Sequence, residues 1–455
     1  MKNLNISILA LAIIELTFCS YTFAKTVPNN IILVIADGMG PSYTTAYRYL
    51  TDNPKTKHVE QTIFDKIIVG SASTYPAPLS TNNNKEHHFF VTDSAASATA
   101  LATGIKTYNG AIGINPQKDS LLTVLEWAKI AGKKTGIAVT SQINHATPAS
   151  FIAKNVERTN YNAIADDYFD LRIDSQFKVD VMFGGGKEYF IRKDRNLKDE
   201  FIQSGYQYID SLKDLDSLNS TKPALGLFAN TGLTKAIDSD DKYRLSTMTK
   251  HATRLLENDK GFFLLVEASQ IDWGGHANDI VYAMNEMKDL AETMKFLESY
   301  VNENPNTLVI LTSDHNTGGF SIGANEIYKW QPEFINSVNQ SPDTIAKRLA
   351  KKELIIANIS SKLGFPLTNS ESKSFESIEA EINGKLTMKE LSNKYAKLIK
   401  EIVNQRSHTG WTTKKHTGVD VPVHAFGLGK ENFNGFQDNT DIAKKIFMLM
   451  GKTTN

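Results

Sequence analysis

The sequence has almost no cysteine, no excess of charge of either sign and no low-complexity tract. Cys19 is the only cysteine among 455 residues, and lysine plus arginine equals aspartate plus glutamate at 50 each. The balanced charge leaves no basic surface for nucleic acid, so nucleic-acid binding is not expected. With 41% hydrophobic and 22% charged residues, the composition is typical of a globular enzyme-sized chain of one large domain with insertions, or of two domains.

The chain also lacks an N-terminal hydrophobic run long enough for a retained membrane anchor. Residues 5–18 are mostly apolar, but Glu15 interrupts them, and a bilayer-spanning helix needs about 20 apolar residues. Because Thr22-Phe23-Ala24 resembles a small-residue cleavage site, residues 1–24 are predicted to be a signal peptide. We therefore expect a periplasmic or secreted protein with no transmembrane anchor in its mature form, and a single catalytic domain over residues 25–455.

Removal of the signal peptide would also remove Cys19. The mature chain would then form neither disulfides nor thiolate metal sites, so any bound metal would need histidine and carboxylate ligands. The alternative is a lipid anchor on Cys19, but the bulky Phe18 stands where a lipoprotein processing site has a small residue.

Short apolar runs alternate with amphipathic segments, which favours an α/β fold with a central, largely parallel sheet flanked by helices on both faces. The continuous hydrophobicity of the runs is typical of strands covered on both faces. Strands are predicted at residues 31–36, 136–140, 179–183, 262–266, 307–312 and 421–426. Helices are predicted at residues 121–131, 160–172, 243–257, 280–301 and 441–450.

Residues 341–406 depart from this alternation, because they are rich in Lys, Glu, Ser and Leu at helical spacing and contain no convincing buried strand. They are predicted to form a helical insertion near the C-terminal third, with helices over 345–354 and 388–403 and a loop over 364–374. A cap over the α/β core and a surface elaboration with no role in the chemistry are both consistent with this pattern.

A serine stands beside an acid at the start of a small-residue helix, in the stretch from Asp93 to Ala100. Taken alone, Ser94 has the position of a helix N-cap, where a hydroxyl accepts an otherwise unpaired backbone N–H. A serine at a helix N-terminus close to metal ions is also a candidate nucleophile. The choice between these roles depends on the polar residues elsewhere in the chain.

Acidic and histidine residues follow three of the predicted strands. Asp37 follows residues 31–36, Glu267 ends the strand that precedes Asp272 and His276, and Asp314 with His315 ends the strand at 307–312. Each has an ordinary alternative: Asp37 as a cap for a helix near Ser42, Asp314 as a turn residue and Glu267 as a solvent-exposed strand end. Carboxylates that converge at the carboxyl ends of strands would repel one another without cations, so metal binding explains the group better.

These motifs together resemble those of the alkaline phosphatase family. The stretch from Asp93 to Ala100 matches the family's nucleophile signature, and the resemblance extends from Asn30 to about Gly429 apart from the helical insertion. Further motifs occur in family order: Asp37-Gly38-Met39-Gly40, His145-Ala146-Thr147-Pro148-Ala149, Gly184-Gly185-Gly186, residues 267–276, Thr312-Ser313-Asp314-His315 and His416-Thr417-Gly418.

The resemblance implies that Ser94 attacks phosphorus and becomes a transient phosphoserine, while Arg158 grips the phosphate. It implies two zinc ions and one magnesium ion. One zinc would be held by Asp272, His276 and His416, and the other by Asp37, Asp314 and His315 with the Ser94 oxygen beside it as a further ligand. The magnesium would be held by Asp37, Thr147 and Glu267.

Two positions vary within the family. His145 stands where some members have an acid, and is expected to meet the magnesium directly or through water. Trp273 stands where some members have a lysine, and simple packing at the rim of the site is the alternative to a role in product release.

The expected activity is hydrolysis of small-molecule phosphate monoesters with release of inorganic phosphate, and the resemblance also implies a homodimer. A phosphodiesterase or sulfatase-like hydrolase on the same scaffold is the alternative enzyme, although Arg158 and the complete serine signature favour the monoesterase. A catalytically silent binder of phosphate or metal is the third possibility, although no expected ligand position lacks a suitable residue.

Overall fold

The computed structural model describes residues 27–80, 86–380 and 386–452. The predicted signal peptide, residues 1–24, and the alternative lipid-anchor site at Cys19 lie outside the described residues. Within the described part of the chain, no helix is long and apolar enough to cross a membrane.

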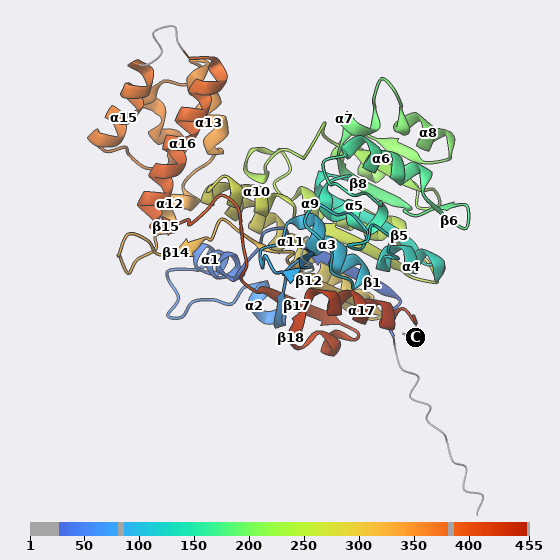
Figure 1. Ribbon diagram of the computed structural model, residues 1–455. Helices are drawn as coiled ribbons and strands as arrows, with labels where there is room; N and C mark the ends of the chain where they lie inside the picture. The colour runs from blue at the N-terminus through green and yellow to red at the C-terminus, as the bar shows by residue number, and fades with distance from the viewer. Residues whose placement is uncertain (1–26, 81–85, 381–385, 453–455) are drawn as a thin grey trace, which may run out of the picture.

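A ten-stranded sheet runs through the molecule, and nine of its strands point the same way (Figure 1). Only β17 runs antiparallel to its neighbours β12 and β2. In the order in which they lie across the sheet, the strands are β18 (Gly435–Asp438), β2 (Ile68–Ser73), β17 (Val421–Gly427), β12 (Thr307–Thr312), β1 (Asn30–Ile35), β11 (Phe262–Glu267), β5 (Lys134–Gln142), β8 (Val181–Gly185), β10 (Ala224–Leu227) and β9 (Gln207–Ile209).

Short two-stranded ladders join loops around this sheet. They pair β3 (Leu79–Ser80) with β4 (Glu86–His87), β6 (Arg172–Ile173) with β7 (Gln176–Phe177), β13 (Asn316–Thr317) with β16 (His416–Thr417), and β14 (Ser321–Ile322) with β15 (Thr409–Gly410). The β13–β16 pair places His416 opposite Thr317, 99 residues earlier in the chain, and so brings His416 close to the end of β12.

The side chains of the central strands alternate between two hydrophobic cores. In β1, Ile32 and Val34 face one core, whereas Ile31, Leu33 and Ile35 face the other, because successive strand residues point to opposite faces. All five are fully buried. This explains the continuous apolar runs in the sequence and confirms a sheet covered on both faces.

Helices cover both faces of the sheet. One core is closed by α1 (Pro41–Thr51), α2 (Ile63–Ile67), α9 (Arg244–Leu256) and α11 (Ile280–Glu303), and the other by α3 (Ser94–Thr103), α4 (Val124–Ile130), α5 (Ala146–Ile152), α6 (Tyr161–Asp170), α8 (Leu197–Gln203) and α17 (Asn439–Leu449). The short α7 (Lys187–Phe190) and α10 (Gln270–His276) and the 3-10 turns η1 (Leu212–Ser217), η2 (Ala236–Asp238) and η4 (Lys430–Phe433) complete the body.

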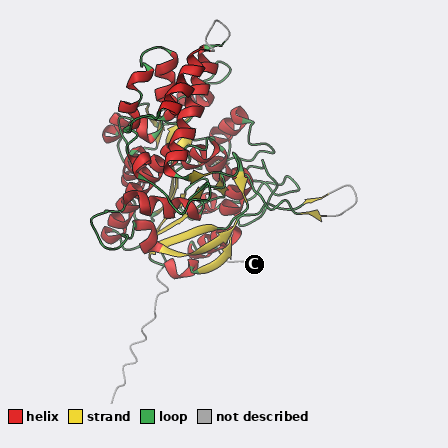
Figure 2. Ribbon diagram, turned by 90° about the vertical axis from the view of Figure 1, so that its left-hand side faces the viewer, coloured by secondary structure: helices red, strands yellow, loops and turns green. Residues whose placement is uncertain are grey.

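The insertion forms a helical unit that stands above the body (Figures 1 and 2). After α12 (Glu333–Asn336) it contains α13 (Pro342–Ala350), η3 (Ile356–Asn358), α14 (Ser360–Leu363), α15 (Asn369–Ala380) and α16 (Met388–Ser407). The expected loop over residues 364–374 is wrong in its second half, because α15 begins at Asn369. Thr368 and Glu371 form a reciprocal cap there, and Phe375 is fully buried.

Candidate active site and metal centre

Ser94 is the first residue of α3, and Asp93 is its N-cap. The Asp93 carboxylate accepts the backbone N–H of Ala96 at 2.9 Å, so the cap role considered for Ser94 belongs to Asp93. The Ser94 hydroxyl is therefore not used in capping. Ser94 Oγ lies 3.0 Å from His315 Nε2, at the positive end of the helix dipole, where negative charge is favoured.

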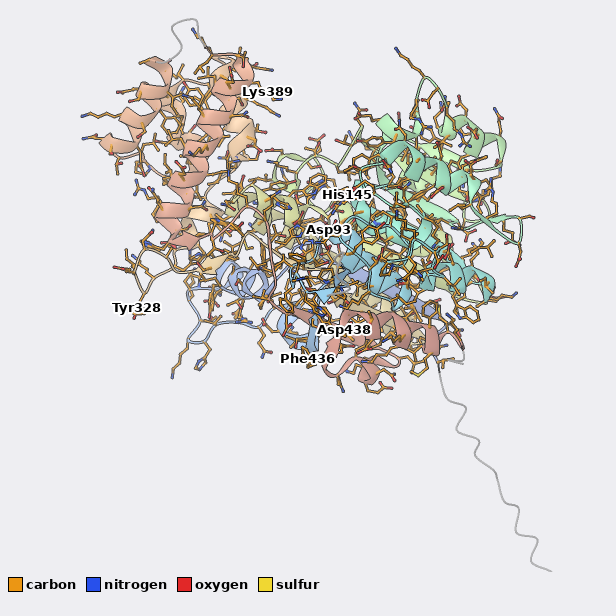
Figure 3. The ribbon with its side chains drawn as sticks, in the orientation of Figure 1. Asp93, His145, Tyr328, Lys389, Phe436 and Asp438 are labelled. Atoms are coloured by element: carbon orange, nitrogen blue, oxygen red, sulfur yellow. The ribbon has the colours of Figure 1, made fainter. Side chains whose placement is uncertain are left out.

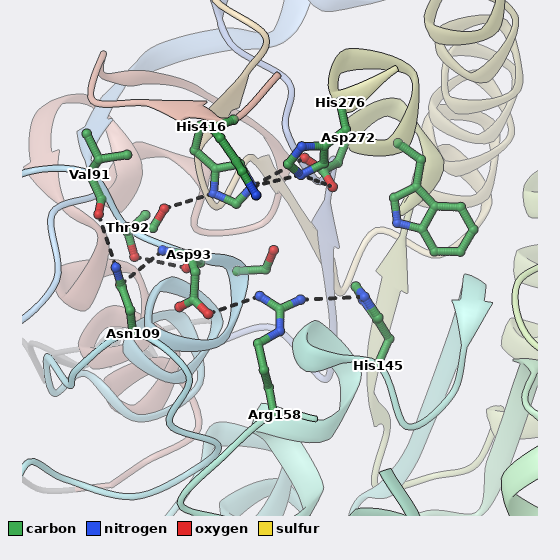
Figure 4. A pocket seen from close by; sticks show the side chains of 12 residues that line it. Val91, Thr92, Asp93, Asn109, His145, Arg158, Asp272, His276 and His416 are labelled. Carbon is green, nitrogen blue, oxygen red and sulfur yellow. Dashed lines mark hydrogen bonds and ion pairs between the residues drawn. The ribbon is translucent and has the colours of Figure 1, made fainter. Parts of the chain in front are cut away.

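Asp93 also positions Arg158. The second oxygen of Asp93 accepts Arg158 Nη1 at 3.0 Å and the backbone N–H of Gly110 at 3.0 Å. Burial alone would lower the pKa of Arg158, but the Asp93 carboxylate outweighs it and raises the pKa. Arg158 lies in the loop between α5 and α6. Figure 4 shows its guanidinium between Asp93 and His145.

The first group of candidate metal ligands contains Asp272, His276 and His416. Asp272 and His276 stand one turn apart on α10, with 3.3 Å between His276 Nε2 and Asp272 Oδ2. His276 Nδ1 lies 2.6 Å from the Lys414 carbonyl oxygen, and His416 Nδ1 lies 2.9 Å from the Thr92 carbonyl oxygen. Each neutral ring therefore carries its proton on Nδ1, and the two Nε2 lone pairs face each other at 3.1 Å. A cation between them would resolve this contact.

The second group contains Asp37, Asp314 and His315, all fully buried. His315 Nε2 lies 3.4 Å from an Asp37 oxygen and 3.2 Å from Asp314 Oδ2. Neither oxygen of Asp37 has a hydrogen-bond partner, nor has Asp314 Oδ2. Buried carboxylate oxygens without partners are costly, so these oxygens fit the role of ligands to a cation. Ser94 Oγ shares the same His315 nitrogen, which places the hydroxyl at this group.

The third group lies on the other side of Asp37. It contains Asp37, His145 and Glu267. Each offers one ligand atom, and these three atoms lie within 4.8 Å of one another. Glu267 Oε2 accepts the Ser141 hydroxyl at 3.1 Å, while Glu267 Oε1, Thr147 Oγ1 and His145 Nδ1 are buried without a partner. Oxygen atoms from Asp37, Thr147 and Glu267 form the hard donor set that magnesium prefers.

The acids repel one another across the three groups. Burial, then the charge of Asp314, raises the pKa of Asp37 well above its ordinary value. Burial, then the charge of Asp272, raises the pKa of Asp314, and burial raises that of Glu267. Burial and the Arg158 charge lower the pKa of His145 to about 3, so this ring is neutral at pH 7. The raised pKa values mean that burial and mutual repulsion disfavour the charged carboxylates, and bound cations would stabilise the charged forms.

The ordinary alternatives for the acids do not hold. Helix α1 has Gly40 as its N-cap with no side-chain cap bond, so Asp37 caps nothing. Glu267 is fully buried, not a solvent-exposed strand end. Asp314 does accept two backbone N–H groups, from Gly38 at 3.2 Å and His315 at 3.0 Å, but only through Oδ1.

A cavity of about 450 Å³ opens onto Ser94 and the first metal-ligand group. Asp93, Arg158, His145 and Trp273 also line it (Figures 3 and 4). The Trp273 ring packs edge-on against His145, with 6.0 Å between ring centroids. Arg158 thus lines the cavity, while Asp37, Glu267 and Asp314 are fully buried beneath it.

Every residue predicted for the site lies at this cavity or in the three groups beneath it. Sequence reasoning missed Thr317, whose hydroxyl donates to Asp272 Oδ1 at 2.5 Å and lies 3.2 Å from His315 Nδ1. It also missed Asn109, whose side-chain oxygen accepts the Asp93 N–H at 3.0 Å. Neither residue follows a predicted strand or belongs to a recognisable motif, so no sequence signal marked them. His87 and His88 precede the Ser94 segment in the chain and are exposed, so they lie outside the three groups.

Comparison with known proteins identifies similar chains along almost the whole length. The sequence profile described as alkaline phosphatase matches residues 28–451. Alkaline phosphatase 3 of Bacillus subtilis is 48% identical over 427 residues, covering 93% of this chain and 89% of its own, and alkaline phosphatase 4 of the same organism is 44% identical over 425 residues, covering 93% and 88%.

Solved structures show the same similarity. The crystal structure of a cold-active alkaline phosphatase from Shewanella sp. has a TM-score of 0.85 and 44% identity, covering 93% of this chain and all of its own. A mutant alkaline phosphatase of the Antarctic bacterium TAB5, described with Mg bound in its M3 site, has a TM-score of 0.67 and 27% identity, covering 94% of this chain and 99% of its own.

Proposed function

The chain belongs to the alkaline phosphatase family, and on that premise we propose that Ser94 is the nucleophile with which it hydrolyses phosphate monoesters. The chain is a metal-dependent phosphoric monoester hydrolase, as its family membership and its relatives at 44–48% identity establish. The observation that carries the assignment is the position of Ser94. Its hydroxyl is free of the capping role and lies 3.0 Å from His315 Nε2, in a cavity that Arg158 also lines.

In the proposed reaction, Ser94 Oγ attacks phosphorus, the bond to the ester oxygen breaks and the alcohol leaves. Water then attacks the phosphoserine, which releases inorganic phosphate and restores the Ser94 hydroxyl. Arg158 has a planar guanidinium that binds two phosphate oxygens at once, and Asp93 fixes its orientation. The N-terminus of α3 favours the negative charge of the transferred phosphate.

We propose that Asp272, His276 and His416 hold one zinc ion, and that Asp37, Asp314 and His315 hold a second beside Ser94. Asp37, Thr147 and Glu267 would hold magnesium, which His145 approaches directly or through water. The unpartnered buried oxygens and the facing Nε2 atoms of the two histidines support these assignments. Bound divalent ions supply charge stabilisation for the attacking and leaving oxygens and lower the pKa of water. A TAB5 alkaline phosphatase mutant, in which Glu replaces a His, is described with magnesium in its M3 site, so a relative of this chain can bind magnesium.

The test is a comparison of wild type with Ser94→Ala on a phosphate monoester, a phosphate diester and a sulfate ester. We expect wild type to prefer the monoester, and Ser94→Ala to lower kcat by about 10³-fold or more, as loss of a nucleophile does in serine hydrolases. Ser220→Ala, at an exposed loop serine, is the matched control and should keep full activity. Wild-type activity on the diester or sulfate ester alone would favour the alternative hydrolases. Unchanged monoesterase activity in Ser94→Ala would remove Ser94 from the mechanism.

We also propose that the protein is exported to the periplasm or secreted after cleavage behind Ala24, and that residues 25–455 form one catalytic domain that assembles as a homodimer. The signal-like composition of residues 1–24 supports export, and the family resemblance supports the dimer. Mass spectrometry of the exported protein should give an N-terminus at Lys25, and analytical ultracentrifugation should give twice the chain mass. Retention of residues 1–24 or a monomeric mass would contradict the respective proposal.

A further inference from the structure

A second cavity lies beside the Ser94 cavity and shares a wall with it. It has a volume of about 300 Å³ and is lined by Pro76, Ala77, Phe89, Tyr108 and Asn109. Asn109 also lines the Ser94 cavity, where its side chain accepts the Asp93 N–H at 3.0 Å and donates to the Val91 carbonyl at 3.2 Å. Asn109, labelled in Figure 4, is therefore a lining residue of both cavities.

The lining of the second cavity is apolar where a ligand would touch it. The Tyr108 hydroxyl donates to the Val156 carbonyl at 3.1 Å, so its polar end is already paired. Both ends of the Asn109 amide are paired as well. The Phe89 side chain is 61% exposed, and next to it His88 and Phe90 stack with 5.8 Å between their ring centroids. Exposed aromatic side chains beside a reaction pocket are typical of a ligand-binding surface.

The walls of this cavity are held in place by the body of the protein. The Ala77 N–H donates to the Thr107 carbonyl at 2.9 Å, which ties the two lining segments together. The Lys106 ammonium lies 4.0 Å from the centre of the Tyr75 ring and 3.1 Å from Asp438. A volume of 300 Å³ is at the lower end of the range of about 300–1,000 Å³ for small-molecule pockets, which fits one ring system and not a protein segment.

We propose that Pro76, Ala77, Phe89 and Tyr108 form a subsite for the alcohol portion of the substrate, which selects phosphate monoesters whose alcohol carries an aromatic ring. The inference rests on the proposed function, because it needs the phosphate to lie at Ser94 and Arg158. With the phosphate there, the alcohol portion of the ester would extend past Asn109, which lines both cavities, into the apolar cavity. A ring in this cavity would cover the exposed face of Phe89 and release the water on it.

The experiment compares two monoesters of primary alcohols with similar leaving groups, 2-phenylethyl phosphate and ethyl phosphate. Their ratio of kcat/KM reports recognition of the ring. We expect wild type to favour the phenylethyl ester by about 10-fold, the size of a modest apolar contact in a specificity pocket. Phe89→Ala should bring the ratio close to one, whereas Phe89→Tyr, which keeps the ring, should retain it.

Two controls separate the subsite from the phosphate site. Inhibition by inorganic phosphate should be equal in wild type and both Phe89 variants, because phosphate does not reach the second cavity. Phe436→Ala removes another exposed phenylalanine, on β18 (Figure 3), and should leave the ratio unchanged. Equal kcat/KM for both esters in wild type, or an undiminished preference in Phe89→Ala, would overturn the subsite and leave the phosphomonoesterase intact. Hydrolysis of neither ester would instead overturn the proposed function.

Discussion

At each histidine of the metal centre, the nitrogen that faces away from the cluster determines what the other nitrogen can do. His276 and His416 pair Nδ1 with backbone carbonyls of Lys414 and Thr92, and His315 pairs Nδ1 with the Thr317 hydroxyl. The Thr317 proton is committed to Asp272, so its oxygen accepts from His315. All three Nε2 atoms therefore present lone pairs to the cluster, which is the state that a metal ligand requires.

At Arg158, mutation can test the contribution of the positive charge separately from that of the planar guanidinium. Arg158→Ala should weaken competitive inhibition by inorganic phosphate about 10- to 100-fold, because it removes charge-assisted hydrogen bonds to the anion. Arg158→Lys keeps the charge but not the planar pair of donors, so it should recover only part of the affinity. The measurement is the inhibition constant of phosphate on a monoester substrate.

The matched control is Arg406→Ala on α16, which also breaks an arginine–carboxylate pair, here with Glu371 at 2.8 Å, but outside the site. It should leave phosphate inhibition unchanged. Equal inhibition of wild type and Arg158→Ala by phosphate would remove Arg158 from the phosphate site.

The chemistry-bearing residues of this chain could be found from the sequence because each stands directly after a strand or inside a motif. Asp37, Glu267 and Asp314 are of this kind. The residues that orient them could not be found, because their role depends on contacts between distant segments. Thr317 reaches Asp272 across 45 residues, and the Thr92 carbonyl meets His416 across 324. The cap alternative for Ser94 could not be decided from the sequence, because Asp93 and Ser94 are both good caps and only the geometry gives the role to Asp93.

At the scale of elements, the site forms where the carboxyl ends of β1, β11 and β12 meet. The three strands are neighbours in the sheet and run parallel, so Asp37, Glu267 and Asp314 emerge at the same edge. Gly38 makes the turn after β1 with a φ of 79°, a conformation that favours glycine, and its N–H donates to Asp314. A side chain at Gly38 would also approach the backbone of Asp272 at 2.7 Å.

The long buried strands and the amphipathic helices were predictable, since burial on both faces leaves a continuous apolar run. All six predicted strands are present, with ends shifted by a few residues. The strands β2, β9, β10 and β18 were missed. β2 has the sequence IVGSAS and is half-buried for most of its length, so it carries neither a continuous nor an alternating apolar pattern.

A buried ionic triad joins helix α4 to two other segments. Glu126 lies on α4, Lys154 follows α5, and Lys178 precedes β8. Glu126 accepts Lys154 Nζ at 3.1 Å and Lys178 Nζ at 2.7 Å, and only 5% of Glu126 is exposed. Burial alone would raise the pKa of Glu126, but the two lysines outweigh it and lower the pKa below its ordinary value. Burial, only partly offset by Glu126, lowers the pKa of Lys154 to about 8.

A carboxylate whose pKa is lower in the folded state adds stability above its unfolded pKa, about 4.3 for glutamate. That stability is lost as pH falls through the lower pKa of the folded state. Glu126→Gln should therefore reduce the acid dependence of the melting temperature below pH 5. At pH 7 it should lower the free energy of unfolding by about 3 kcal/mol, because two buried ammonium groups lose their partner.

The measurement is the melting temperature from pH 3 to pH 8 by calorimetry. Glu292→Gln breaks the more exposed pair with Lys295 on α11 and serves as the control, with little change expected. If Glu126→Gln has the same melting temperatures as wild type both below pH 5 and at pH 7, the triad adds nothing to folding.

At the scale of the whole molecule, the candidate metal centre brings together segments that lie far apart in the chain. The proposed ligands come from the end of β1, from α5, from β11 and α10, from the end of β12 and from β16. The helical insertion lies between β14 and β15 in the chain. His416 therefore follows the insertion in sequence, whereas the other proposed ligands precede it. The insertion is tied to the body by Asp238, which accepts the Ser341 N–H at 2.9 Å and the Thr344 hydroxyl at 2.8 Å.

Removal of the metal ions should therefore destabilise the whole fold and not only stop turnover. Without cations, Asp37, Glu267 and Asp314 lie buried close together with unpartnered oxygens, at the junction of the central strands. An ion that binds only the folded state adds about 4 kcal/mol when its free concentration is a thousand times its Kd. Chelation should lower the melting temperature even though the chelated protein keeps its secondary structure below that temperature. Addition of zinc and then of magnesium should restore the melting temperature in two steps.

The two steps can be assigned with variants and metal analysis. Asp272→Asn should reduce the bound zinc by at least one ion per chain while magnesium is retained, because Asp272 contacts both histidines of the first group and also lies close to Asp37 and His315. Glu267→Gln should reduce magnesium and keep both zinc ions, since Glu267 meets only the third group. These contents are measured by plasma mass spectrometry after gel filtration, alongside the melting temperatures. A chelated protein that melts at the same temperature as the loaded one would mean that the buried carboxylates are satisfied without metal, and the cation assignments would then be wrong.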